Sequence, residues 1–202
     1  MRKWIGVVLI MFFMTGCVQN DEQTDAKTII TVKPVDLYKG ESAKFKPFMG
    51  TMSGAIKLGY MGKKPNASLD LEIWQKGKPA ESVGSIGDLY FSSEDADKNR
   101  EIEVIIALED DVDGQKMRVK LGTFYDSGNS VSTFTIPLEI KLMARGVLND
   151  SEPRSFASED NAADPVWAMY ATSSNVIRTA DLTLEALKEQ EWALVVLYRS
   201  TN

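Results

Sequence analysis

The chain has 202 residues and a formal net charge of −6. An acidic chain is repelled by nucleic acid phosphates and by anionic lipid headgroups, so we expect neither nucleic acid nor a membrane-binding basic face. Histidine is absent and Cys17 is the only cysteine. This excludes histidine-dependent nucleophilic catalysis, imidazole metal ligands and a disulfide within the chain.

The first sixteen residues have the pattern of a secretory signal. Arg2 and Lys3 precede an uncharged, apolar run of 13 residues from Trp4 to Gly16. A basic start, a short apolar run and small residues before a cleavage point define such a signal. Because a helix needs about 20 apolar residues to span a bilayer, we expect cleavage here and not a permanent span.

The end of this segment, Met14-Thr15-Gly16-Cys17, resembles the lipobox of bacterial lipoproteins. The resemblance covers residues 1–17 only and departs from the usual leucine at Met14. It implies cleavage between Gly16 and Cys17 and a diacylglyceryl group on the Cys17 thiol. Since two acyl chains give stable attachment, it further implies a protein held at the outer face of the cell membrane, or at the outer membrane where a cell has two.

The rest of the chain is expected to be a tether followed by one domain. Without residues 1–16 the net charge changes from −6 to −8, because Arg2 and Lys3 are the only charges there. Residues 17–27 are then the lipidated start and a flexible polar tether, with a reach on the order of 15–20 Å. Residues 28–202 are long enough for one domain with a hydrophobic core.

Apolar and polar residues alternate through the middle of the chain, which is typical of antiparallel strands with one face in water. We expect strands at residues 30–34, 45–49, 56–60, 69–75, 101–108, 117–124, 132–142 and 166–170. Asp113-Gly114 predicts a hairpin. Many short strands between turn signals predict a mainly β chain, folded as a single antiparallel β-sandwich or jelly-roll-like domain.

The C-terminal part has a different pattern. Residues 146–165 are polar and lack alternation, which predicts a long loop. Residues 182–190 fit either a short helix capped by Thr183 or a strand. Residues 192–198 are apolar at every position, which predicts a strand buried on both faces.

No catalytic motif is present, and we predict no catalytic residue, cofactor or metal site. Glu109 to Gly114 resembles the start of a calcium loop, but Lys120 stands where that loop requires a bidentate glutamate. We therefore interpret this segment as an acidic hairpin tip. A carboxylate pair of a carbohydrate hydrolase stays an alternative, although no pair can be singled out among 29 acidic residues.

Aromatic residues give the best indication of binding. Trp74 is out of phase with Leu71 and Ile73, and Trp167 and Tyr170 lie near the C-terminus. Exposed aromatic side chains can stack on sugars or anchor protein partners, whereas core packing is the alternative for each of them. We expect Trp74, Trp167 and Tyr170 to form a surface of a non-enzymatic module that binds an envelope protein or a glycan. A hydrolase and a purely structural envelope protein are the alternatives.

Overall fold

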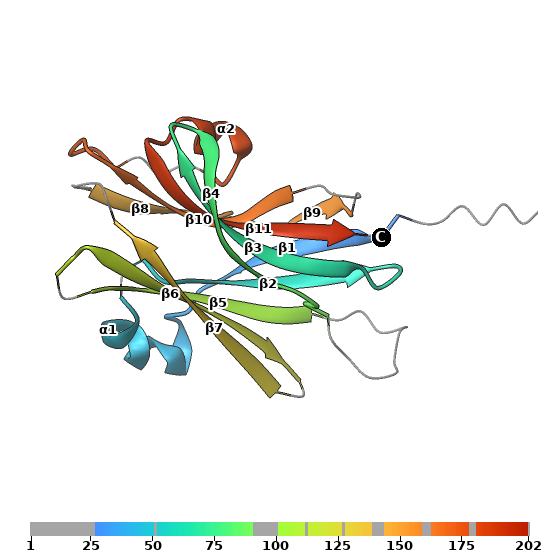
Figure 1. Ribbon diagram of the computed structural model, residues 1–202. Helices are drawn as coiled ribbons and strands as arrows, with labels where there is room; N and C mark the ends of the chain where they lie inside the picture. The colour runs from blue at the N-terminus through green and yellow to red at the C-terminus, as the bar shows by residue number, and fades with distance from the viewer. Residues whose placement is uncertain are drawn as a thin grey trace, which may run out of the picture.

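The computed structural model describes residues 27–50, 52–90, 101–111, 113–126, 128–138, 144–158, 163–177 and 181–201. These residues form two antiparallel sheets that pack face to face, with few helices (Figure 1). The predicted fold class, a mainly β sandwich, is therefore confirmed.

Sheet A has the strand order β7-β6-β5-β2-β1-β9, and sheet B has the order β4-β3-β11-β10-β8. The elements are β1 (Ile29–Val35), the 3-10 helix η1 (Gly40–Phe45), α1 (Lys46–Met49), β2 (Gly54–Met61), β3 (Asn66–Gln75), β4 (Lys78–Ile86), β5 (Glu101–Asp110), β6 (Lys116–Tyr125), β7 (Gly128–Pro137), β8 (Ala144–Leu148), β9 (Arg154–Ala157), β10 (Ala163–Thr172), α2 (Leu184–Lys188) and β11 (Trp192–Thr201).

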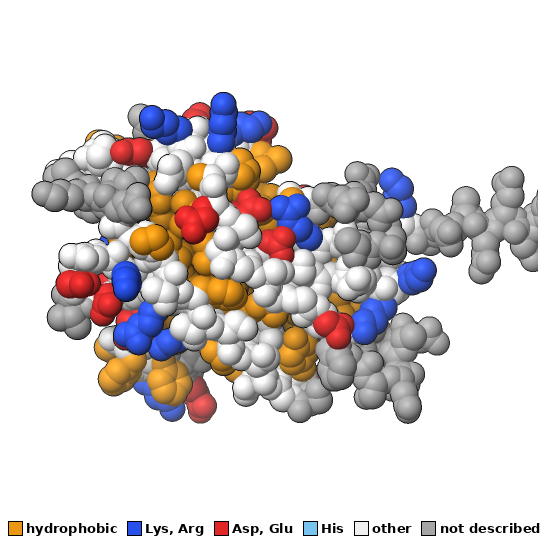
Figure 2. All heavy atoms as spheres, in the orientation of Figure 1, with side chains coloured by type: hydrophobic (Ala, Val, Ile, Leu, Met, Phe, Trp, Pro, Cys, Tyr) orange, Lys and Arg blue, Asp and Glu red, His pale blue; other side chains and the backbone are white. Residues whose placement is uncertain are grey.

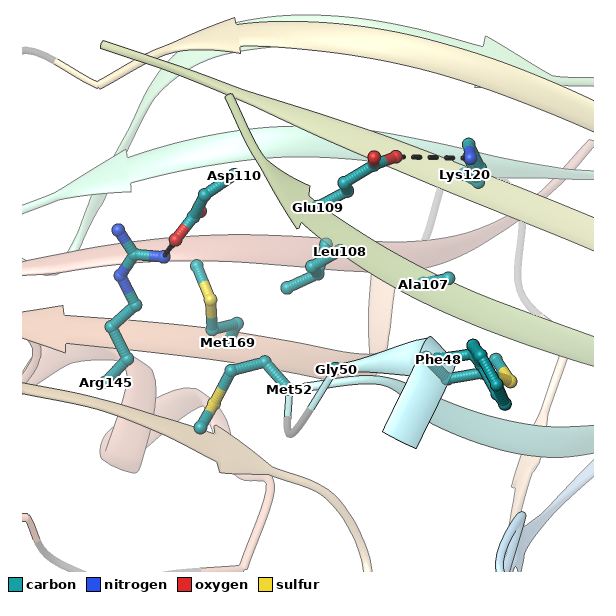
Figure 3. A pocket seen from close by; sticks show the side chains of 11 residues that line it. Phe48, Gly50, Met52, Ala107, Leu108, Glu109, Asp110, Lys120, Arg145 and Met169 are labelled. Atoms are coloured by element: carbon teal, nitrogen blue, oxygen red, sulfur yellow. Dashed lines mark hydrogen bonds and ion pairs between the residues drawn. The ribbon is translucent and has the colours of Figure 1, made fainter. Parts of the chain in front are cut away.

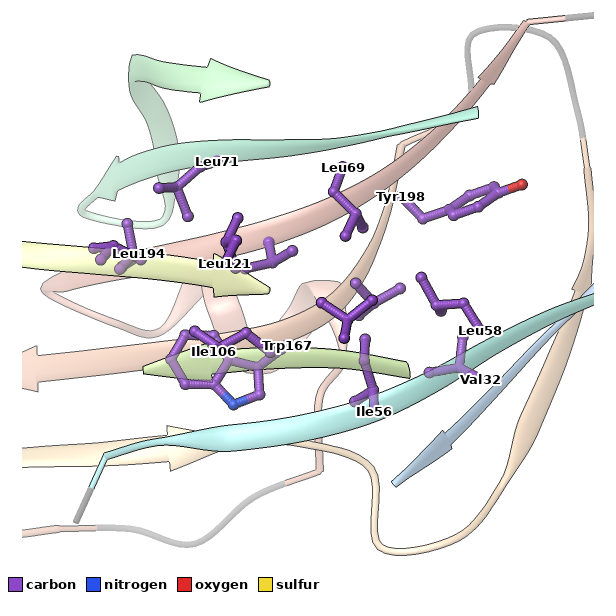
Figure 4. Packing of buried hydrophobic residues seen from close by; sticks show 14 of the residues in the cluster. Val32, Ile56, Leu58, Leu69, Leu71, Ile106, Leu121, Trp167, Leu194 and Tyr198 are labelled. Atoms are coloured by element: carbon purple, nitrogen blue, oxygen red, sulfur yellow. The ribbon is translucent and has the colours of Figure 1, made fainter. Parts of the chain in front are cut away.

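The main hydrophobic core lies between the two sheets (Figure 4). In β5, every second side chain faces this core, and Ile102, Val104 and Ile106 are buried there. Leu69 and Leu71 of β3 face them from sheet B. Burial of each such side chain stabilises the fold by roughly 1.5–3 kcal/mol, so the alternation in the sequence decides which face of each strand points inward.

The outer face of sheet B is buried as well. The Thr183 hydroxyl oxygen accepts the backbone N–H of Ala186 at 3.0 Å and caps α2. Leu187 of this helix packs with Val195 and Leu197 on the outer face of β11. Since β11 also faces the main core and lies between β3 and β10, it is buried on both faces, as predicted, and the helical alternative for residues 182–190 is confirmed.

The Asp113-Gly114 hairpin between β5 and β6 is confirmed. Gly114 has a φ of 65°, which favours glycine. Its N–H donates to the Asp111 carbonyl at 2.9 Å, and the Asp111 N–H donates to the carbonyl of Lys116 at the same distance. The acidic segment is thus a hairpin turn, as predicted.

The strand predicted at residues 45–49 is wrong. Phe45 ends η1 and Lys46–Met49 is α1, with no buried residue in either. Pro47 suits the first turn of a helix because its missing N–H has no partner there. Gly50, with a φ of 73°, follows the helix in a conformation that favours glycine.

The long loop predicted at residues 146–165 is also wrong. β8 extends to Leu148, β9 (Arg154–Ala157) pairs with β1, and β10 begins at Ala163; residues 159–162 lie outside the described part of the chain. β8 and β9 have five and four residues and lie at sheet edges. Strands this short show too little alternation to be recognised in a sequence.

Two further strands differ from the sequence prediction. β4 was not predicted, because none of its residues is buried and its pairing with β3 shifts register twice. The strand predicted at residues 132–142 corresponds to β7, which begins earlier, at Gly128, and ends at Pro137. Residues 139–143 lie outside the described residues.

Candidate functional site

The three aromatic residues predicted to form an exposed surface are buried. The exposed fractions of Trp74, Trp167 and Tyr170 are 7%, 1% and 3%. The prediction of an exposed aromatic surface at these residues is therefore wrong, and core packing, the alternative, applies to all three.

Trp74 and Tyr170 lie on the outer face of sheet B, in the cluster that includes Leu182 and Leu187. The Trp74 indole N–H donates to a carboxylate oxygen of Glu72 at 3.0 Å. The sequence placed Trp74 on a face exposed to water because residues of the same strand are charged. The segment around α2, with Leu182 and Leu187, covers that face and buries Trp74. The alternation within one strand cannot predict that another segment covers it.

Trp167 points the other way, into the core between the sheets (Figure 4). A Cβ atom added at Gly54 would lie 2.3 Å from its indole nitrogen, so β2 comes close to the ring only because residue 54 has no side chain. The ring is thus a packing element of the core.

The residues of the predicted membrane anchor lie outside the described part of the chain. These are the signal at residues 1–16, the cleavage point between Gly16 and Cys17, and the tether up to residue 26. The described chain begins at Lys27, just before Ile29 of β1, which pairs with Met61. Within the described residues no helix is both long and apolar enough to cross a membrane.

The end of the sandwich near Lys27 is filled by packed aromatic rings. The rings of Tyr60 and Tyr90 meet edge to face, with centroids 4.8 Å apart. Burial raises the pKa of Tyr90 and of Tyr198 above the usual range for tyrosine. Both phenols are therefore neutral at physiological pH, and these rings act as packing elements of the core.

A pocket opens at the other end of the sandwich (Figure 3). Its volume is about 630 Å³. Apolar and charged side chains share its lining, drawn from both sheets and from α1. We call it the methionine pocket, and its lining residues are Phe48, Met49, Gly50, Met52, Ala107, Leu108, Glu109, Asp110, Lys120, Arg145 and Met169.

Two ion pairs border the methionine pocket. One guanidinium nitrogen of Arg145 lies 2.7 and 2.8 Å from the two carboxylate oxygens of Asp110, and so joins β8 of sheet B to β5 of sheet A. The ammonium group of Lys120 lies 3.3 Å from Glu109. Leu108 and Met169 lie next to these charged groups, and Met52 lies below Met169 in the view (Figure 3).

The α1 side of the pocket carries its most exposed apolar residue. The side chain of Phe48 is 86% exposed, and Phe45 in η1 is 51% exposed. Figure 2 shows hydrophobic side chains at the surface in the region of η1 and α1, at the lower left. The Tyr38 hydroxyl donates to the carbonyl of Gly50 at 3.0 Å, which holds the segment after α1 in place.

The sequence does not reveal this pocket, because its residues come from five separate segments. Only the fold brings Phe48, Leu108, Arg145 and Met169 together. The alternation at residues 45–49 predicts a strand, and this wrong prediction hides the surface position of Phe45 and Phe48. Pro47 and Gly50 are residue types typical of the start and the end of a helix, and they are the local pattern that favours a helix here.

The described residues hold no group of three or more acidic residues placed to bind a metal ion. Glu109 and Asp110 are consecutive in β5, so their side chains leave opposite faces of the strand. Each is ion-paired with a cation. This arrangement differs from the facing carboxylate pair of a glycoside hydrolase.

Comparisons with models of known protein families, with curated proteins and with solved structures found no match to this chain.

Proposed function

We propose that the chain is a bacterial lipoprotein, held at a membrane by lipid on Cys17, whose sandwich is a non-enzymatic binding module. The methionine pocket receives an apolar segment of an envelope protein. The observation that carries this proposal is the position of the pocket, at the end of the sandwich opposite the point where the chain enters it.

The strand register supports this placement. Ile29 pairs with Met61 where the described chain enters sheet A, whereas Val35 pairs with Ala55 at the far end of β1. Ala55 in turn pairs with Ile105, and the pocket residues of β5 follow. Seven residues of strand span about 20 Å. A tether at Lys27 therefore leaves the pocket on the side that faces away from the lipid.

The lining of the pocket suits a protein segment better than a sugar. Methionine side chains are flexible and polarisable, and they adapt to apolar partners of different shape. Exposed Phe48 offers an anchor beside them. Because Glu109 and Asp110 are each ion-paired, the pocket does not favour the hydrolase alternative. Confinement to the membrane would raise the local concentration of the module near its partner.

The lipid anchor is tested with a Cys17→Ser variant in the organism that produces the chain. We expect the native protein to incorporate labelled fatty acid and to fractionate with membranes. The variant should lose the label and leave the membrane fraction, because no other cysteine can accept the lipid. A variant that stays membrane-bound without label would contradict the anchor.

The pocket is tested by photo-crosslinking in cells. A benzophenone amino acid replaces Phe48 in one variant and Met61, which is 52% exposed at the opposite end, in a matched control. We expect one discrete crosslinked product from position 48 that weakens in the Cys17→Ser background. Equal products from the two positions, or none from position 48 in a membrane-bound protein, would refute the pocket as the binding site.

A further inference from the structure

The two sheets end in four edge strands, and three of these carry features that oppose pairing with another chain. Short length, charge, proline and bulges all protect a sheet edge. β8 and β9 have five and four residues and carry Arg145 and Arg154. β4 carries Lys78, Pro79 and Glu81, and its register with β3 shifts twice.

The fourth edge strand, β7, has none of these features along its length. It has ten residues, and its register with β6 is unbroken from Gly128 to Pro137. It contains no charged residue, and its one proline is its last residue. Within the described residues β6 is the only strand that pairs with β7, and Figure 1 shows the β6–β7 hairpin at the lower side of the molecule.

The contact between β7 and β4 does not protect this edge. The contact is made by Phe134 of β7 and Gly84 of β4. A Cβ atom added at Gly84 would lie only 2.3 Å from a carbon of the Phe134 ring. Phe134 belongs to the inward-facing series with buried Ile136. The two strands therefore meet across the interior of the sandwich, and they are not hydrogen-bonded neighbours.

The outward-facing residues of β7 suit a further strand. Val131, Thr133 and Thr135 are β-branched and exposed, and such residues pair well across strands. Val131 is 59% exposed and lies beside Phe124 of β6, which is 37% exposed. A strand added at this edge would shield part of that apolar surface.

We propose that β7 pairs with β7 of a second copy of this chain, in antiparallel orientation about a two-fold axis. β7 is itself extended and uncharged along its ten residues, and among the described residues it has no partner strand on one edge, so a second copy supplies a matching strand. The described strand pairs of both sheets are antiparallel, as this pairing is. Each copy has a net charge of −6 as the full chain and −8 without residues 1–16, and an uncharged edge allows the closest approach of two acidic copies.

Overlap of the two ten-residue strands over all but one residue places the axis at Ser132 or Thr133. Residues that face each other across the axis must leave the same side of the sheet, so the axis passes through a residue position. Two six-stranded sheets then continue as one. The interface is isologous, because the same residues are contributed by both copies.

The oligomeric state tests this proposal. We expect the full chain, in detergent, to sediment as a dimer and a Val131→Lys variant to sediment as a monomer. Val131 faces Gly122 on β6, so the lysine meets no charge within its own chain. The matched control is Ser82→Lys on the β4 edge, which should stay dimeric. A native chain that is monomeric at every concentration measured, or an equal effect of the two lysines, overturns the proposal.

Disulfide trapping locates the axis without detergent. In the Cys17→Ser background an introduced cysteine is the only thiol, and a disulfide forms only when the two Cα atoms lie within about 7 Å. We expect Ser132→Cys or Thr133→Cys to yield disulfide-linked dimers and Asn129→Cys to yield none. Crosslinking that is equal at the three positions, or that is strongest for Ser82→Cys on β4, overturns the pairing. Because this background lacks the lipid, the result is independent of the anchor.

Discussion

Glycines let backbone and aromatic rings approach closely at two places in the sandwich. Gly54 of β2 faces the indole of Trp167, and Gly146 of β8 faces the ring of Tyr170, where an added Cβ would lie 2.5 Å from the nearest ring carbon. Both rings are almost fully buried. Two of the three aromatic residues that the sequence placed at a surface, Trp167 and Tyr170, thus pack closely against neighbours that lack a side chain.

Gly54→Ala is expected to lower the free energy of unfolding by about 1–3 kcal/mol, because the new methyl group overlaps the Trp167 ring in a packed core. Urea denaturation measures this change. Gly87→Ala is the matched control, since an added Cβ at Gly87 has no atom within 4 Å. The control should change stability little, and an equally small effect at Gly54 would show that the ring can move away.

The strands were predictable where one face of the strand is buried in the core and the other face is in contact with water. Alternation located β1, β2, β3, β5 and β6 because burial imposes a period of two residues. It failed for β4, which has no buried residue, and for the short strands β8 and β9. Their existence depends on pairing with distant strands, and a local pattern does not record that pairing.

The helix α2 depends on its cap and on the sheet beneath it. Thr183→Ala is expected to lower the free energy of unfolding by about 1 kcal/mol, because the backbone N–H of Ala186 loses its acceptor. Thr183→Ser keeps a hydroxyl and should stay close to the native value. Thermal denaturation of the two variants decides the point, and equal losses would mean that the hydroxyl is not the stabilising group.

At the scale of the whole molecule, the sandwich has two distinct ends. The chain enters at Lys27, where tyrosine rings fill the interior, and the methionine pocket opens at the other end. The sequence predicted the fold, which is confirmed, and a lipid anchor, which lies outside the described residues and stays a prediction. The pocket could not be predicted, since its residues Phe48 and Met169 are more than a hundred residues apart in the chain. Only the topology of the two sheets places them together.

The proposed function depends first on how the exported chain begins. Mass spectrometry of the N-terminal peptide from the membrane fraction measures this directly. We predict a peptide that starts at Cys17 and carries at least two fatty acyl chains. A peptide that starts at Met1, or one that carries a free thiol at Cys17, would contradict the account.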